Sequence, residues 1–121
     1  MKGFGENQSK KKKIINENKK IYNDQLIKKA FKFQAEGKKL EAAKYYSYLI
    51  KNGLKDHRVF SNYGSFLKEI GKYQEAELEL TKSIKLNPKC ANSFFNLGGL
   101  FLIKGDLIKG EIFLRKAIDF K

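Results

Sequence analysis

Apolar residues recur along most of the chain at spacings of three and four, which is the pattern of amphipathic α-helices. The first such helix is predicted over residues 24–36 and the last over residues 107–120. Between them the helical pattern is interrupted where turn-forming residues occur, and no stretch alternates as a β-strand would. The interruptions lie at Gly37, Asn52 with Gly53, Gly71, Pro88 and Gly105. The pattern therefore predicts an all-α protein of short helices joined by tight turns.

The same pattern returns every 34 residues. A shift of this length aligns small or turn-forming residues with one another: Ala30, Gly64 and Gly98; Gly37, Gly71 and Gly105; Ala42, Ala76 and Gly110. A fixed period of this size is typical of a solenoid in which helical hairpins stack. We expect three hairpins, at about residues 23–56, 57–90 and 91–121, forming one repeat domain over residues 23–121.

The middle repeat carries the fullest set of size-matched positions: Phe60, Tyr63, Gly64, Leu67, Gly71, Tyr73, Ala76, Leu80, Ser83 and Pro88. With these positions the chain resembles the tetratricopeptide repeat (TPR) family. The third repeat departs at Gly110, where the family usually has alanine, and the first departs at Lys29 and at Leu54, which replaces the closing proline. The resemblance implies a right-handed α-solenoid whose first helices line a concave groove that binds peptides of partner proteins.

The resemblance also implies which residues line that groove. The candidate peptide-binding residues are Lys28, Phe31, Arg58, Asn62, Ser65, Asn92, Phe95 and Asn96. Asn62 and Asn96 occupy the same place in successive repeats, where an amide can pair with a peptide backbone as donor and acceptor. The other reading is that both amides are simply solvated. A carboxylate clamp of the kind that holds the acidic tails of heat-shock chaperones is not expected, because only Asn62 matches its pattern.

The chain is strongly basic, with 26 Lys and Arg against 13 Asp and Glu and a net charge of +13. Such an excess attracts phosphates, anionic lipid or acidic peptide without choosing between them. Only Arg58 and Arg115 are arginines, so nearly all the cations lack the planar fork that reads bases or phosphates in a bidentate way. Specific nucleic-acid recognition is therefore disfavoured.

Residues 1–22 have no sustained apolar period and carry seven Lys against two Glu. We expect a basic, disordered tail. The run from Lys10 to Lys13, followed by Ile14 and Ile15, also suits a short amphipathic helix on an anionic surface, so contact with nucleic acid or anionic membrane is a second reading of this segment.

Candidates for catalysis and metal binding are few. Cys90 is the only cysteine and His57 the only histidine, which leaves no internal disulfide and too few such ligands for a metal site. As a nucleophile and base the two are expected to lie about a repeat apart. We therefore expect a non-enzymatic protein without a cofactor. The absence of a signal-peptide core or a membrane-spanning window favours a cytoplasmic location.

The last predicted helix leaves an apolar face without a following helix to cover it. We expect Phe101, Ile108, Ile112, Phe113 and Phe120 to remain partly uncovered. Either this hairpin stacks on another molecule, including a second copy, or the chain is the front piece of a longer array. The function predicted from the sequence is a protein-interaction adaptor. The alternatives are the substrate-recognition front of a glycosyltransferase, sulfotransferase or methyltransferase chain, and a basic module that acts through its tail.

Overall fold

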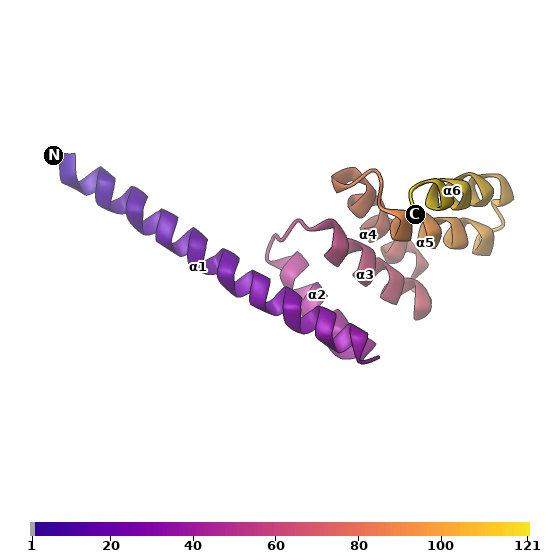
Figure 1. The fold of residues 1–121 in the computed structure, drawn as a ribbon, viewed down its shortest axis with the longest axis horizontal. Helices are drawn as coiled ribbons and strands as arrows, with labels where there is room; N and C mark the ends of the chain where they lie inside the picture. Colours follow the sequence, from indigo (N-terminus) through magenta and orange to yellow (C-terminus); the bar gives the residue numbers. More distant parts are fainter. Residues whose placement is uncertain (1) are drawn as a thin grey trace.

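The computed structural model describes residues 2–121, which form six α-helices joined by short turns (Figure 1). The helices are α1 (Lys2–Ala35), α2 (Lys39–Lys51), α3 (His57–Glu69), α4 (Tyr73–Leu86), α5 (Ala91–Ile103) and α6 (Leu107–Asp119). Successive helices pair as α1 with α2, α3 with α4 and α5 with α6, and α2–α3, α3–α5 and α4–α5 contacts join the pairs. The prediction of an all-α fold of three stacked hairpins is therefore confirmed.

One turn geometry is repeated in all three hairpins. Gly37, Gly71 and Gly105 have φ angles of 78°, 82° and 85°, in the left-handed region where a side chain would be strained. Each hairpin therefore turns at the same point of the 34-residue period. The start of α3 is capped as its sequence suggests, because the side chain of Asp56 accepts a hydrogen bond of 2.9 Å from the backbone N–H of Arg58.

The two helices of a hairpin pack closely where a glycine, Gly64 or Gly98, lies at the point of contact. A Cβ atom placed on Gly98 would lie 2.7 Å from Cγ of Leu114 and 3.2 Å from the carbonyl oxygen of Gly110. On Gly64 it would lie 2.6 Å from Cγ of Leu80. These distances are too short for carbon atoms, so the small residues allow the helix axes to approach. The fully buried side chains between the helices include Tyr46, Leu49, Val59, Leu80 and Leu100.

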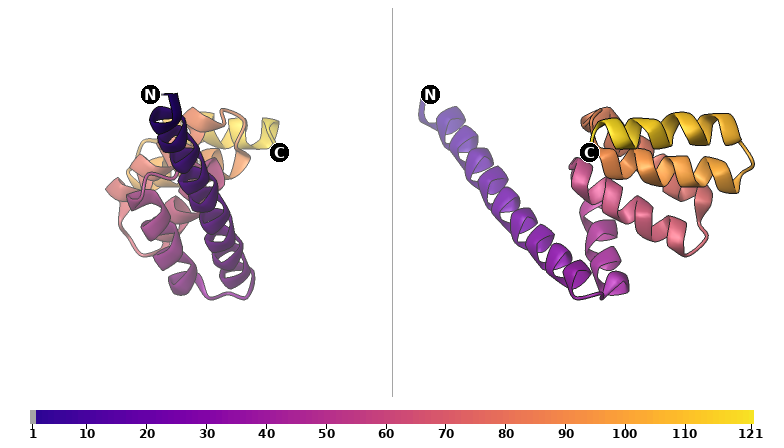
Figure 2. Two further views of the ribbon diagram at one scale, coloured as in Figure 1. Left: turned by 90° about the vertical axis from the view of Figure 1, so that its left-hand side faces the viewer. Right: turned by 45° about the vertical axis from the view of Figure 1, so that its right-hand side comes forward.

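The prediction of a disordered tail over residues 1–22 is wrong for residues 2–22, and residue 1 lies outside the described residues. Residues 2–22 continue the first helix, which extends away from the hairpins as an N-terminal arm (Figures 1 and 2). Helix propagation is far easier than nucleation. The packed residues Leu26, Ile27 and Ala30 supply the nucleus, and the lysines and glutamates before them are good helix formers. Residues 5–22 are nevertheless all exposed, and among them Tyr22, at the base of the arm, lines a cavity with Lys44, Tyr45 and Tyr48 of α2. None of the described helices is long and apolar enough to cross a membrane.

Candidate functional site

A polar cavity of about 390 Å³ lies on the side of the stack formed by the first helix of each hairpin. Helix α1 contributes Gln34, whereas the remaining lining residues come from α3 and α5: Ser61, Asn62, Ser65, Lys68, Glu69, Asn92, Phe95 and Asn96. Five of the eight predicted groove residues are thus brought together, namely Asn62, Ser65, Asn92, Phe95 and Asn96. We call this cavity the groove.

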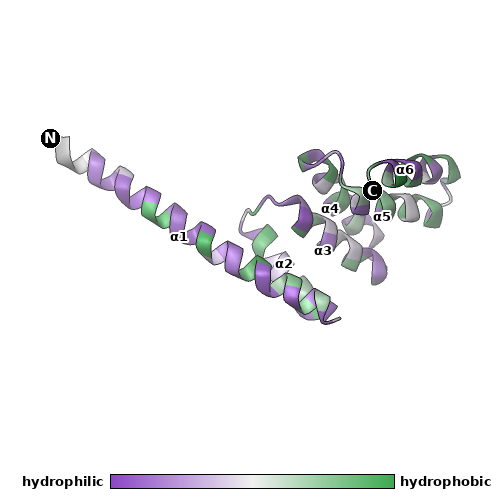
Figure 3. Ribbon diagram, in the orientation of Figure 1, coloured by the Kyte–Doolittle hydropathy of each residue, from purple (hydrophilic) through white to green (hydrophobic). Residues whose placement is uncertain are grey.

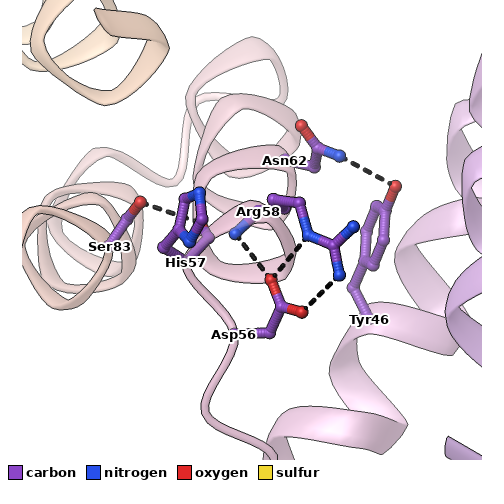
Figure 4. A network of polar contacts seen from close by, with 6 residues as sticks. All are labelled: Tyr46, Asp56, His57, Arg58, Asn62 and Ser83. Atoms are coloured by element: carbon purple, nitrogen blue, oxygen red, sulfur yellow. Dashed lines mark hydrogen bonds and ion pairs between the residues drawn. The ribbon is translucent and has the colours of Figure 1, made fainter. Parts of the chain in front are cut away.

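The three other predicted residues, Lys28, Phe31 and Arg58, do not line the groove. Lys28 is exposed on α1. The guanidinium of Arg58 lies 5.2 Å from the centre of the Phe31 ring and pairs with Asp56 through contacts of 3.1 and 2.7 Å (Figure 4). The hydrogen bonds from Arg58 hold the pKa of Asp56 below its ordinary value, against the opposing effect of burial. Arg58 is therefore neutralised by Asp56, two residues before it in the chain.

A hydrogen-bonded chain links three helices at the groove. Nδ2 of Asn62 donates to the hydroxyl of Tyr46 at 3.1 Å, and that hydroxyl donates to Oε1 of Gln34 at 2.6 Å. Figure 4 shows the amide on α3 directed toward the phenol on α2. Burial raises the pKa of Tyr46, and the hydrogen bond from Asn62 opposes that rise. The sequence pattern predicts Tyr46 only as a core residue. Its hydrogen bond from Asn62, which joins the first and second hairpins, shows that it also positions a groove side chain.

Asn96 behaves differently from Asn62, although both occupy the same place in the repeat. Its Nδ2 donates to the backbone carbonyl of Asn92, one helical turn earlier, at 2.9 Å. The reason lies in the preceding hairpin, where a shift of 34 residues places Leu80 at the position of Tyr46. Leucine offers no hydroxyl. The two amides of the predicted ladder are therefore not equivalent: one is held by a neighbour and the other by its own helix.

Phe95 and Lys68 give the groove one apolar and one cationic element. The Phe95 side chain is 59% exposed, which is unusual for an aromatic ring. The ammonium of Lys68 lies 5.7 Å from the ring centre. The neighbouring Glu69 is paired with Lys39 at 3.0 Å, whereas no carboxylate among the described residues pairs with Lys68. The groove therefore presents an open aromatic surface beside an available positive charge.

A buried polar cluster between the second and third hairpins is a feature that sequence reasoning missed. Oγ of Ser93 donates to Oγ of Ser83 at 2.8 Å, and Ser83 donates to the backbone carbonyl of His57 at 2.8 Å (Figure 4). Ser83 also lies 3.8 Å from the thiol sulfur of Cys90. The backbone of His57 and the thiol of Cys90, expected to lie far apart, are therefore bridged by one serine.

The thiol of Cys90 is influenced by the same cluster. Burial raises its pKa, but hydrogen bonds from Ser93 and Ser83 outweigh burial, so that the pKa lies below its ordinary value. The hydroxyl of Ser61 is also buried beside the thiol of Cys90 and helps to lower its pKa, and it has no other hydrogen-bond partner among the described residues. Among those residues no group of three or more His, Cys, Asp and Glu side chains is placed to hold a metal ion.

Comparison with known families agrees with the hairpin architecture. Residues 57–90, the middle hairpin, match a family model described as the tetratricopeptide repeat. Residues 57–90 are therefore a tetratricopeptide repeat. The match covers the unit with the fullest set of signature residues, and the stacked hairpins on either side repeat its geometry. No curated protein sequence matches the whole chain significantly.

Several solved structures share this fold. The second TPR of Spaghetti (RPAP3), bound to the HSP90 peptide SRMEEVD, has a TM-score of 0.79 and 21% identity, covering 93% of this chain and 98% of that chain. The Yersinia enterocolitica chaperone SycD, in complex with a peptide of the translocator YopD, has a TM-score of 0.69 and 26% identity, covering 80% and 74%. PcrH, in complex with the chaperone binding region of PopD, has a TM-score of 0.70 and 23% identity, covering 80% and 73%.

The last hairpin of this TPR array has an uncovered apolar face. A cavity of about 460 Å³ lies there, lined by Ala91, Asn92, Phe95, Leu114, Ala117, Ile118 and Lys121. Shifted back by one repeat, Leu114 corresponds to Leu80 and Ala117 to Ser83, residues that pack against α5. Ile108 and Ile118 are 76% and 73% exposed. Of the five residues expected to be partly uncovered, Ile108, Ile112 and Phe120 are exposed, and Phe101 and Phe113 are partly buried because their rings pack on each other and on the core.

Proposed function

We propose that the protein is a non-enzymatic interaction module that holds an extended peptide of a partner protein in the groove. The observation that carries the proposal is the convergence of Asn62, Asn96 and Phe95 from two hairpins on one open cavity. Amide side chains offer a donor and an acceptor to a peptide backbone, and an exposed ring offers a surface for one ligand side chain. Such a site holds a ligand without any reacting group.

The solved relatives support a peptide as the ligand. The second TPR of Spaghetti, SycD and PcrH were each solved with a peptide or a binding region of another protein. Their ligands differ, and the sequence identities are too low to transfer any one of them to this chain. The shared element is the class of ligand, a segment of a partner protein.

The chemistry of the groove narrows that class. Because Lys68 is an available cation beside the open ring of Phe95, the ligand carries a bulky apolar side chain next to a carboxylate. The acidic peptide SRMEEVD is a useful contrast. The clamp that holds such tails is absent, since Asn62 alone matches it. We expect this peptide to bind weakly or not at all.

Selection from a library of random linear peptides displayed on phage tests the proposal. Peptides enriched on the wild-type protein are expected to carry an aromatic or aliphatic residue beside Asp or Glu. The variant Asn62→Ala with Asn96→Ala should lose their binding at least about tenfold while its helical circular-dichroism signal is unchanged. Asn16→Ala with Asn18→Ala, two exposed asparagines of the arm, is the matched control. Equal binding by the groove variant and the control would contradict the proposal.

We also propose self-association through the uncovered face of the last hairpin. On the preceding hairpin the equivalent surface is covered by α5, so a helical, apolar occupant fits it. SycD, a relative of the same fold, is described as forming an alternative dimer. Light scattering of the wild type should show a mass that rises with concentration, and Ile118→Lys should remove that rise. A monomeric mass for the wild type at all concentrations would contradict this second proposal.

A further inference from the structure

The N-terminal arm carries a second apolar surface, separate from the one that holds α1 in the array. Ile14 and Ile21 lie seven residues apart and therefore on one line along the helix, with Ile15 and Tyr22 on the adjacent line. All four are exposed, by 51% to 64%. Figure 3 shows that most of the projecting part of α1 is hydrophilic, with a few hydrophobic bands. We call these four residues the arm stripe.

The arm stripe does not continue the packing face of α1. At about 100° per residue, its centre lies roughly a third of a turn around the helix from Leu26, Ile27 and Ala30, which are buried against the other helices. A stripe in line with the packing face would point toward the array. This stripe points elsewhere, along an arm of roughly 30 Å that extends clear of the hairpins (Figures 1 and 2). Its partner is therefore outside this chain's own fold.

Charge indicates what that partner is. Residues 5–22 contain six lysines and two glutamates, and none of these lysines is paired with a carboxylate among the described residues. By helical position Lys12, Lys13, Lys19 and Lys20 lie outside the arm stripe, on its flank and on the opposite side. Lys11 lies within it, where a long side chain can extend to the aqueous side. An apolar stripe with lysines around it is the pattern of a helix that lies in an anionic lipid surface.

Two other partners fit less well. A coiled coil between two arms needs apolar residues at both seam positions, but beside the arm stripe Lys11 and Asn18 occupy the second seam position, and the like charges repel. Nucleic acid would engage the lysines but would leave the isoleucines in water, and the arm has no arginine for bidentate contacts. We infer that the arm binds the surface of an anionic phospholipid bilayer, with the arm stripe inserted among the lipid chains and the lysines at the headgroups.

Vesicle co-sedimentation of the full chain tests this inference. The wild type should sediment with vesicles in which about a third of the lipid is phosphatidylglycerol, and at least about tenfold less with pure phosphatidylcholine. Ile14→Ser with Ile15→Ser and Ile21→Ser retains every charge and should lower binding by about tenfold or more. The matched control is Leu40→Ser with Ile70→Ser and Leu78→Ser, which removes three exposed apolar side chains from the array. It should bind as the wild type does.

A single tryptophan separates insertion from surface charge attraction, because the chain has no tryptophan of its own. With Ile15→Trp, fluorescence should shift to the blue on adding the anionic vesicles, whereas Asn16→Trp, on the polar side of the arm, should show little shift. Duplex DNA should produce no shift in either variant. The inference is overturned if the isoleucine variant binds vesicles as well as its control does, if DNA binding exceeds vesicle binding at equal salt, or if the arms sediment as a dimer that vesicles do not dissociate.

Discussion

The amide of Asn62 is joined to the hydroxyl of Tyr46 at 3.1 Å, across the boundary between the first and second hairpins. One repeat later Asn96 faces Leu80 in the corresponding place and bonds to its own backbone instead. Equivalent positions of successive repeats therefore have different hydrogen-bond partners in the groove. The amide of Asn62 is held by Tyr46 in the absence of a ligand. The amide of Asn96 must give up its hydrogen bond to the carbonyl of Asn92 before its N–H can bind a ligand.

Replacing the phenol with a phenyl ring tests this link. Tyr46→Phe removes the hydrogen bonds to Asn62 and Gln34 and leaves their amides short of a partner, so the free energy of unfolding should fall by about 1 kcal/mol. Urea denaturation followed by circular dichroism measures the change. Tyr48→Phe, an exposed tyrosine on the same helix, is the control and should not alter the midpoint. Equal midpoints for both variants would show that the link contributes nothing to stability.

Close packing at Gly64 predicts a graded response to side-chain size. Gly64→Ala places a methyl group against Leu80 and should cost about 1–3 kcal/mol, whereas Gly64→Leu should prevent the array from folding. Thermal melts followed by circular dichroism rank the stabilities of the wild type and the two variants. Gly5→Ala, at a helical glycine with no atom within 4 Å, should change the stability by less than about 0.5 kcal/mol. A melt of Gly64→Leu that matches the wild type would contradict the packing argument.

Two buried serines of the same cluster should respond with opposite signs. Ser83→Ala removes the acceptor of Ser93 and the donor to His57, so the free energy of unfolding should fall by about 1–3 kcal/mol. Ser61→Ala removes a buried hydroxyl that has no partner among the described residues other than the weakly accepting thiol of Cys90, so the stability should be unchanged or rise by about 1 kcal/mol. Chemical denaturation of the two variants measures both changes in the free energy of unfolding. An equal loss for Ser83→Ala and Ser61→Ala would contradict the prediction.

Asp56 should stabilise the protein in a pH-dependent way. Its carboxylate caps α3 and pairs with Arg58, and Asp56→Ala should cost about 1 kcal/mol at neutral pH. The pKa of Asp56 is lower in the folded protein than its ordinary value of 3.8, so this contribution is fully present above that value and is lost as the pH falls through the folded pKa. The stability difference between wild type and variant should therefore shrink in acid. Asp56→Asn retains the cap without the charge, so its loss at neutral pH should be smaller, and that loss should also shrink in acid because only the wild-type carboxylate titrates.

Local sequence patterns were enough to predict most of the architecture. The hairpin turns follow from glycines at a constant interval, because only glycine adopts the required φ angle at no cost. The positions of Asn62, Phe95 and Asn96 on one face follow from the helical period once the repeat is recognised. The extent of α1 was not predicted, because residues 2–22 have little apolar periodicity of their own and are helical as an extension of a packed segment.

The sequence by itself determined the period, the turns and the side of each helix that faces the groove, since these depend on residues near one another in the chain. The tertiary structure alone decided which side chains meet between hairpins, Tyr46 with Asn62 and Ser83 with Ser93, and left Ile14, Ile15 and Ile21 of the arm exposed. Such contacts depend on the offset and tilt of stacked helices. Those quantities come from the packing of all the hairpins together, and no single segment specifies them.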